Sequence, residues 1–353
     1  MSDARAAEAR EDWQAAELSY LKALKLAPDW AEVLVNLGVV YNREGKTEDA
    51  IRAFTRAAQI KPRLFAAHLN LGVTYFKAGR FGEATAPLRR VVLIQPENTQ
   101  ARKLLALSLI ALESFQEAVE QLEALNKQQP GETPILQALG QSYLRLKLYD
   151  QAVKVLAELV RSKPESAQAH LWLGEALDNA SESERAIQEF RQAIEIDPRL
   201  LEANYALGYA LLKRGDNDEA AKYFAKELEI NPNMTLALFH LAKINLSRGQ
   251  VNEAALQLVK VIETEPDFRP GLEALGQALL KKGEAASAVE VLDRAVRLDP
   301  KWPDGHALLG RAYIAAGRRA EAKKEFDIAQ KLGAEERKRL EQKVSGSKSR
   351  PRS

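Results

Sequence analysis

The sequence lacks several features that carry common protein functions. It contains no cysteine among its 353 residues, which excludes disulfide scaffolds, thiolate zinc sites and cysteine nucleophiles. An excess of one charge is also missing, because 51 Lys and Arg face 49 Asp and Glu, for a net charge of +2. Proteins that bind nucleic acid or anionic membrane usually concentrate basic charge on one face, so this balance gives no general drive towards either partner.

Long apolar segments are missing too. The longest stretch without a formal charge, about residues 230–242, contains two Asn and one Pro, whereas a membrane-spanning helix needs roughly 20 mostly apolar residues. The first ten residues carry acids and bases but no apolar core of a signal peptide. We therefore expect no membrane span and a cytoplasmic location, with a signal peptide removed beforehand as the alternative.

What the sequence does have is a strict period of 34 residues, marked by proline. Only five of the 14 prolines fall outside this series, so chance does not explain it. Its nine members are Pro28, Pro62, Pro96, Pro130, Pro164, Pro198, Pro232, Pro266 and Pro300. Self-similarity at a fixed period of this length indicates a repeat architecture.

With this proline at position 32 of each unit, four other columns align. Position 7 is Leu in all nine units that reach it, position 8 is Gly or Ala, position 20 is Ala, and position 24 is large and apolar. Apolar residues at positions 4, 7, 8 and 11, and again at 20, 24, 27 and 28, have the spacing of amphipathic helices. Each unit is thus predicted to be two closely packed helices joined by a turn, in which position 15 is often Gly.

These columns resemble the tetratricopeptide repeat (TPR) family over about residues 4–333. Tyr at position 11 (Tyr41, Tyr75) and Ala at position 27 (Ala23, Ala57) belong to the same pattern, although the family's Trp at position 4 is missing. The resemblance implies an all-α, right-handed superhelical solenoid of 34-residue helix-turn-helix repeats. Glu227 is a clear departure, because position 27 normally faces packed apolar groups.

The period also predicts the domain organisation. We expect a partial repeat over residues 1–30, nine consecutive repeats over 31–333, a polar capping helix over 334–344 and a disordered basic tail over 345–353. The nine repeats are predicted at 31–64, 65–98, 99–132, 133–166, 167–200, 201–234, 235–268, 269–302 and 303–333.

Catalytic motifs are not found in the sequence. It has no Gly-rich phosphate loop and no HExxH, CxxC or GxSxG pattern. Three of the four histidines, His68, His170 and His306, occupy position 4 of repeats far apart in the chain, so they cannot share a metal. We expect core or interface histidines, no enzyme activity, no metal and no cofactor.

The resemblance implies that first helices line a concave face through positions 2, 5, 6, 9, 12 and 13. Exposed aromatics flanked by charge on such a face are typical of a peptide-binding groove. The candidate peptide-binding residues are Asn36, Val39, Asn70, Val73, Phe76, Lys77, Tyr205, Tyr209, Lys213, Phe239 and Lys243.

Each part of this candidate face has an alternative interpretation. Tyr205, Tyr209 and Phe239 could form a ligand patch, but position 5 can also pack against the neighbouring repeat. Asn36 and Asn70 could clamp a peptide backbone, since an amide both donates and accepts, although Asn is common there in TPRs. Lysines at position 13 could line a rim for acidic ligands, but Lys is usual at that position in the family.

The leading functional hypothesis is a non-catalytic scaffold that binds an extended peptide or a helix of partner proteins in the concave groove. The alternative is a substrate-recognition repeat region cut from a larger enzyme or assembly machine. Nucleic-acid binding through the basic tail is a third hypothesis, for which we expect weak, salt-sensitive affinity. The ends of the solenoid are candidate edges for oligomerisation.

Overall fold

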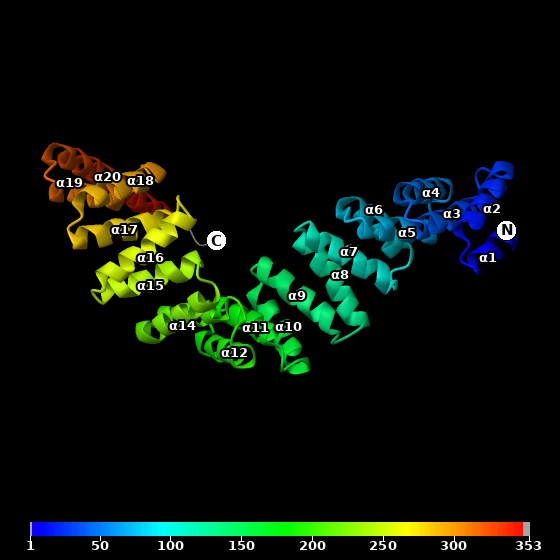
Figure 1. Ribbon diagram of the computed structural model, residues 1–353, viewed down its shortest axis with the longest axis horizontal. Helices are drawn as coiled ribbons and strands as arrows, with labels where there is room; N and C mark the ends of the chain where they lie inside the picture. The colour runs from blue at the N-terminus through cyan, green and yellow to red at the C-terminus, as the bar shows by residue number, and fades with distance from the viewer. Residues whose placement is uncertain (1, 349–353) are drawn as a thin grey trace. The chain divides into compact units, whose positions relative to one another are not determined.

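The computed structural model describes residues 2–348, and these residues are all-α, as the sequence predicts. Within this range the chain forms twenty α-helices and no strand (Figure 1). The helices belong to two compact units, Met1–Glu189 and Phe190–Ser353, and the boundary falls inside α12 (Ser183–Ile196).

Within each unit, every helix packs against the next one in the sequence. The other helices of the first unit are α1 (Ser2–Glu8), α2 (Trp13–Leu26), α3 (Ala31–Arg43), α4 (Thr47–Ile60), α5 (Phe65–Lys77), α6 (Phe81–Ile94), α7 (Thr99–Ala111), α8 (Phe115–Gln128), α9 (Thr133–Arg145), α10 (Tyr149–Ser162) and α11 (Ala167–Asn179). Those of the second unit are α13 (Ala203–Arg214), α14 (Asn217–Ile230), α15 (Thr235–Ser247), α16 (Val251–Thr264), α17 (Arg269–Lys282), α18 (Ala285–Leu298), α19 (Pro303–Ala315) and α20 (Arg319–Lys348). Odd-numbered helices from α3 onwards are the first helices of their repeats, and even-numbered ones are the second helices.

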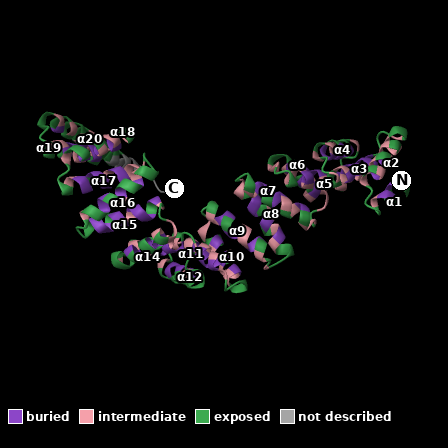
Figure 2. Cartoon of the chain, in the orientation of Figure 1, coloured by how far each residue is buried: buried purple, intermediate pink, exposed green. Residues whose placement is uncertain are grey.

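The small residue at position 8 lets the two helices of a repeat close on each other. A Cβ atom added to Gly38 would lie 2.5 Å from the ring of Phe54, which is the bulky residue at position 24. At Gly208 the added atom would lie 3.0 Å from Phe224 and 3.2 Å from the backbone oxygen of Ala220. The buried residues accordingly lie between the packed helices (Figure 2), because alanine and glycine columns bring the two backbones together.

The turn inside each repeat needs a left-handed residue at position 15, whether or not glycine is present. Gly45 has a φ of 76° there, and glycine adopts this conformation at little cost. Glu113, Lys147 and Ser181 hold the same position with φ values of 57°, 58° and 65°. Glu11, at this position of the partial first repeat, has a φ of 56°. The turn geometry is therefore imposed by helix packing, and three full repeats and the partial one accept a side chain that strains it.

The column prolines end the second helices. In the repeat that contains Pro62, α4 stops at Ile60, and the backbone N–H of Lys61 donates to the carbonyl of Ala57. Proline cannot donate a helical hydrogen bond and forces the preceding residue towards an extended conformation. The same arrangement recurs at the other repeats that carry this proline, for example before Pro232.

Glu227 has a structural role that its apolar column did not predict. Its carboxylate is fully buried and accepts hydrogen bonds from the backbone N–H groups of Glu202 (3.0 Å) and Tyr205 (3.2 Å). These groups lie at the start of α13, which begins only at Ala203, after Glu202 adopts a φ of 69°. The buried acid thus caps a first helix whose opening turn is displaced.

The two ends of the chain differ from regular repeats. At the N-terminal end the short helix α1 buries Ala4 and Ala7 in a cluster that includes Tyr20. At the other end, α20 runs from Arg319 to Lys348 without a break. This helix includes residues 334–344, for which the sequence predicts a separate capping helix, and residues 345–348 of the predicted tail; residues 349–353 lie outside the described part.

The continuity of α20 has a simple cause. The next proline of the 34-residue series would stand at position 334, which is Ala334. Without the proline, nothing stops the helix there. None of the helices over residues 2–348 is both long enough and apolar enough to cross a membrane.

Candidate functional site

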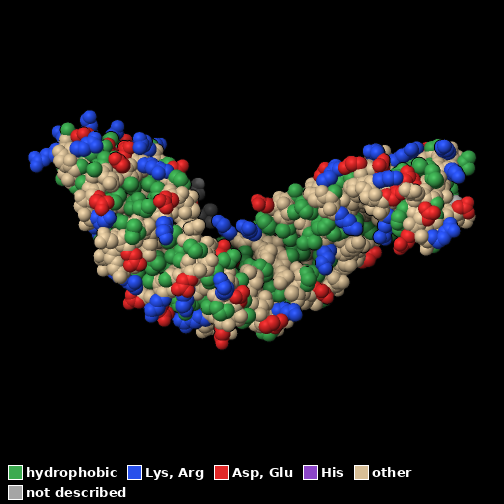
Figure 3. Space-filling model, in the orientation of Figure 1, with side chains coloured by type: hydrophobic (Ala, Val, Ile, Leu, Met, Phe, Trp, Pro, Cys, Tyr) green, Lys and Arg blue, Asp and Glu red, His purple; other side chains and the backbone are tan. Residues whose placement is uncertain are grey.

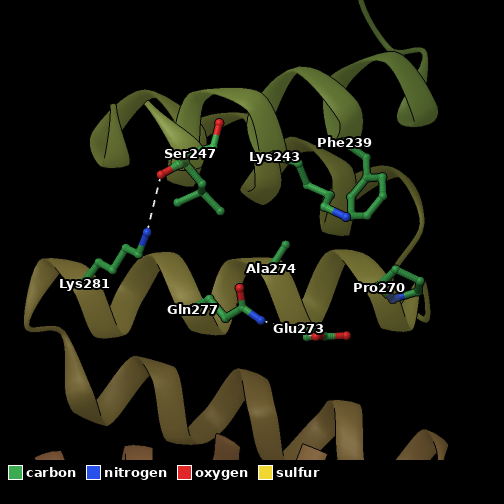
Figure 4. A pocket seen from close by; sticks show the side chains of 9 residues that line it. Phe239, Lys243, Ser247, Pro270, Glu273, Ala274, Gln277 and Lys281 are labelled. Carbon is green, nitrogen blue, oxygen red and sulfur yellow. Dashed lines mark hydrogen bonds between the residues drawn. The ribbon is translucent and has the colours of Figure 1, made fainter. Parts of the chain in front are cut away.

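A pocket of about 350 Å³ lies between two consecutive first helices of the second unit, α15 and α17. Figure 4 shows its side chains reaching inwards from both helices. Its lining residues are Phe239, Lys243, Leu246 and Ser247 from α15, and Pro270, Glu273, Ala274, Gln277 and Lys281 from α17.

Helical spacing explains why these residues meet. On each helix they follow one another at steps of three or four residues or as direct neighbours, so they share one face. Pro270 stands in the first turn of α17, where its missing N–H costs nothing. All nine residues occupy positions 2, 5, 6, 9, 12 or 13 of their repeats, which are the positions that the family resemblance assigns to the binding face.

The pocket combines an apolar wall with charges of both signs. The Lys243 ammonium lies 5.5 Å from the centre of the Phe239 ring, and Lys281 donates to the carbonyl of Leu246 at 3.4 Å. On α17, which also carries Lys281, Gln277 donates to the Glu273 carboxylate at 3.2 Å. Such a surface offers apolar contact together with hydrogen-bond donors and acceptors to a ligand.

The environment of Glu273 disfavours its charge. Burial raises the pKa of the Glu273 carboxyl above its ordinary value, although Arg269 and Lys243 oppose the effect. The Arg269 guanidinium lies 3.8 Å from the Glu273 carboxylate. A ligand cation or amide donor placed near Glu273 would therefore compensate for lost hydration.

An aromatic cluster extends from this pocket to α13. Tyr205 and Tyr209 stack with ring centres 6.1 Å apart, and the His240 ring lies 5.3 Å from Tyr209. His240 also lies 5.3 Å from Phe239. Burial, followed by the nearby Lys243 charge, lowers the pKa of His240 to about 4, so the imidazole is neutral at pH 7.

The structure brings the five predicted residues of the second unit together, with different exposures. Tyr209 is 38% exposed, and Lys213 lies over its ring at 6.0 Å. Tyr205 is half-buried, and burial raises the pKa of its hydroxyl to about 12. Phe239, expected to be an exposed aromatic, is only 9% exposed because its ring packs edge-on against Phe268 at 5.1 Å. Phe239 is therefore a buried packing residue, and its partner Phe268 is the last residue of the same repeat, 235–268.

The six predicted residues of the first unit do not line the α15–α17 pocket. Asn70 donates its side-chain amide to the Ala66 carbonyl of its own helix at 2.9 Å, so one donor of the proposed asparagine clamp is already used. Asn36 lies near the Tyr20 hydroxyl, which itself donates to the Glu8 carboxylate at 2.9 Å.

Apolar packing accounts for two more of the six. Val39 packs on the core cluster of α3 and α4, and Phe76 packs edge-on against Phe81 at 5.4 Å. Val73 is half-buried on α5, and Lys77 is exposed at its last turn.

The predicted site residues do not include Glu273 and Gln277, which line the pocket, or His240, which lies beside it in the aromatic cluster. They occupy positions 5, 9 and 6 of their repeats, on the same predicted face. Applying those positions to the repeat 269–302 would have found Glu273 and Gln277. Exposed aromatic residues do not point to Glu273 and Gln277, because α17 contains no aromatic side chain.

The remaining histidines have structural partners. His68, His170 and His306 each place Nε2 3.1 Å from the carbonyl of a column proline. His170 and His306 also place Nδ1 2.6 Å from Glu189 and Glu325. Over the described residues, no three His, Asp or Glu side chains are arranged to hold a metal ion.

Paired helices at a 34-residue period, with a pocket between first helices, define a helical-repeat protein. Two tetratricopeptide repeat models match the chain, one at residues 3–64, 138–200, 205–272 and 241–304, the other at 41–107 and 279–340. The chain therefore belongs to the tetratricopeptide repeat family. Members of this family generally mediate protein–protein interactions and are typically non-catalytic.

Several solved structures are similar to part or most of this chain. The structure of Naa15/Naa10 bound to HypK-THB aligns with a TM-score of 0.55 and 18% identity, over 93% of this chain and 62% of that chain. MamA from Desulfovibrio magneticus RS-1 (residues 41 to the end) aligns at 0.45 and 24% identity, over 48% of this chain and 96% of that chain. YrrB, described as a TPR protein with an unusual peptide-binding site, aligns at 0.48 and 20% identity, over 53% of this chain and 96% of that chain. No curated protein matches the chain.

Proposed function

We propose that this protein is a non-catalytic scaffold that binds an extended peptide or a helix of partner proteins on the face formed by its first helices. The observation that carries the proposal is the α15–α17 pocket, whose lining comes entirely from that face. The stacked rings of Tyr205 and Tyr209 continue the surface towards α13.

The chemistry of the face suits a polypeptide. An apolar side chain of the ligand can contact half-buried Pro270 beside the buried Phe239 and Leu246, while Gln277 can donate to and accept from a peptide bond. Lys243 on α15, and Glu273 and Lys281 at different turns of α17, give the ligand a preferred direction through charge. The alternative, a substrate-recognition region of a larger enzyme or assembly machine, would use this same surface.

The experiment compares the partners captured from the native host by two variants and the wild-type protein. The test variant, Tyr209→Ala with Gln277→Ala, removes two exposed side chains and keeps buried Phe239 in place. The control is Leu256→Ala, which removes an exposed leucine from the second helix α16. We expect at least one partner to be lost or strongly depleted with the test variant and retained with the control; recovery of every partner at wild-type level with the test variant would reject the proposed face.

A further inference from the structure

A second groove, in the first unit, lies between the two second helices α2 and α4, with α3 as its floor. Its volume is about 530 Å³. The apolar side chains that line it are Leu18, Leu21, Leu24, Leu34, Leu37, Tyr41 and Ala53. None of these residues belongs to the α15–α17 pocket, and the groove is built from second helices at its walls rather than first helices.

Leu18 makes this groove unusual among the repeats. It is 60% exposed and stands at position 22, the sixth residue of α2. In the other units position 22 holds Arg52, Ala86, Glu120, Lys154, Gln188, Lys222, Leu256, Glu290 and Lys324. A large apolar side chain thus occurs at this position only in α2 and α16. A leucine beside an apolar groove leaves area that a ligand could bury, with a gain of about 25 cal/mol per Å².

Basic side chains stand on both walls of the groove. Lys22 and Lys25 are three residues apart on α2, and Arg52 and Arg56 are four apart on α4, so each pair lies on one helix face. Figure 3 shows several Lys and Arg side chains among hydrophobic ones over the part of the chain that contains α2 and α4.

Within the described part of the chain, the acids near the groove pair with the arginines of the α4 wall and leave the lysines of the α2 wall unpaired. Asp49, the one carboxylate in the lining, pairs with Arg52, and Asp29 lies 3.4 Å from Arg56. Lys22 and Lys25 form no ion pair with any residue that the structure describes. The lining therefore carries four cations against one carboxylate, in a chain whose total charge is nearly balanced.

We propose that the α2–α4 groove binds an acidic amphipathic helix of a partner protein. A stripe of leucines flanked on both sides by cations is complementary to a helix that carries an apolar stripe with Asp or Glu on both flanks. Both walls are helices of 14 residues, about 21 Å long, which matches a ligand helix of similar length. This site is independent of the α15–α17 pocket.

The chain supplies a matched control at α16. Leu256 is 70% exposed and is likewise the sixth residue of a 14-residue second helix. The residues that correspond to the four cations are Lys260 and Glu263 on α16, and Glu290 and Arg294 on α18. A leucine that is even more exposed, in a mixed-charge setting, separates the effect of the groove from that of general hydrophobicity.

The test selects ligands from a displayed library of random peptides of about 16 residues, long enough for four helical turns. Peptides that bind the wild-type protein are counter-selected on Leu18→Glu, a substitution at an exposed site, and circular dichroism checks that this variant is folded. We expect enriched peptides with Asp or Glu flanking apolar residues at helical spacing. Their affinity should fall about tenfold or more in Leu18→Glu and in Lys25→Glu with Arg56→Glu, and stay unchanged in Leu256→Glu.

Other outcomes would overturn the proposal. These are enrichment without acidic residues, equal loss of binding in Leu256→Glu, or no peptides that distinguish Leu18→Glu from wild type. Sedimentation showing a dimer that Leu18→Glu dissociates would assign the groove to a second copy of this chain. Co-sedimentation with phosphatidylserine vesicles that Lys25→Glu with Arg56→Glu abolishes, in the absence of peptide binding, would assign it to a membrane.

Discussion

Among single residues, Glu227 shows how a departure from the repeat pattern is accommodated. A carboxylate in an apolar column needs partners, because an unpaired buried charge is very costly. The backbone N–H groups of Glu202 and Tyr205 supply them, and α13 begins late as a result. The sequence shows that position 227 is unusual, but it does not show where the donors come from, since they lie 22 and 25 residues earlier in the chain.

Replacing Glu227 with Leu leaves two backbone donors unpaired. We expect the second unit to lose about 2–4 kcal/mol of unfolding free energy, and amide hydrogen exchange at residues 202 and 205 to accelerate. The control is Glu229→Leu, an exposed position on the same helix. Equal effects of the two substitutions on exchange at 202 and 205 would contradict the capping role.

Because the pKa of His240 is lowered in the folded protein, we expect the stability of the protein to depend on pH. The pKa of His240 in the folded protein is about 4, against 6.5 for the ordinary group, so the unfolded chain binds the proton more readily. The neutral His240 ring contributes up to roughly 3 kcal/mol to the free energy of unfolding. This contribution is complete above pH 6.5 and is lost as the pH falls towards 4.

The titration of His240 can be measured directly by NMR, from the shift of its ring Cε1 proton. His240→Phe keeps an aromatic ring in the stack and removes the titrating group. We therefore expect the loss of stability between pH 6.5 and pH 4 to be smaller in this variant than in the wild type. A midpoint near 6.5, or an unchanged pH profile in the variant, would show that the ring is well hydrated.

For the helices and turns, the repeat pattern predicts most of the structure. Column prolines give the ends of second helices, and the small and bulky columns give the helix pairs, as at Gly38 and Phe54. These features follow from local rules, namely helical spacing and the missing N–H of proline. The late start of α13 and the uninterrupted α20 were not predicted, because they depend on a distant buried acid and on a proline that is missing from the last repeat.

The turn at Lys147 offers a stabilising substitution. Lys147 holds a φ of 58°, a conformation that costs a side chain roughly 1–2 kcal/mol. Lys147→Gly removes this strain at the expense of a more flexible unfolded chain, and we expect a net gain of about 0.5–1 kcal/mol. Denaturant unfolding provides the measurement.

The reverse substitution serves as the control. Gly249→Ala places a side chain at a residue with a φ of 78° and should destabilise the protein by about 1 kcal/mol. If both substitutions destabilise the protein, position 15 is controlled by contacts of its side chain rather than by backbone conformation.

At the scale of the molecule, the sequence predicts one face as the binding face for partner polypeptides. It does not predict where on that face a pocket forms. The positions assigned to it include all nine residues of the α15–α17 pocket. Whether a pocket forms depends on side-chain packing: Phe239 turns onto Phe268, while Phe76 packs on Phe81 in the first unit. Such choices depend on neighbouring repeats and are not encoded in the columns.

The most direct measurement places a photo-crosslinking amino acid at Gln277, an exposed residue in the pocket, in the full-length protein in its native host. The same group at Leu256, on the exposed side of α16, is the matched position. We expect a discrete crosslinked polypeptide from position 277, and we expect that product to be missing when the crosslinking group is at position 256. The absence of any crosslink at 277, or the same product from both positions, would contradict the claim that the first-helix face binds partner polypeptides.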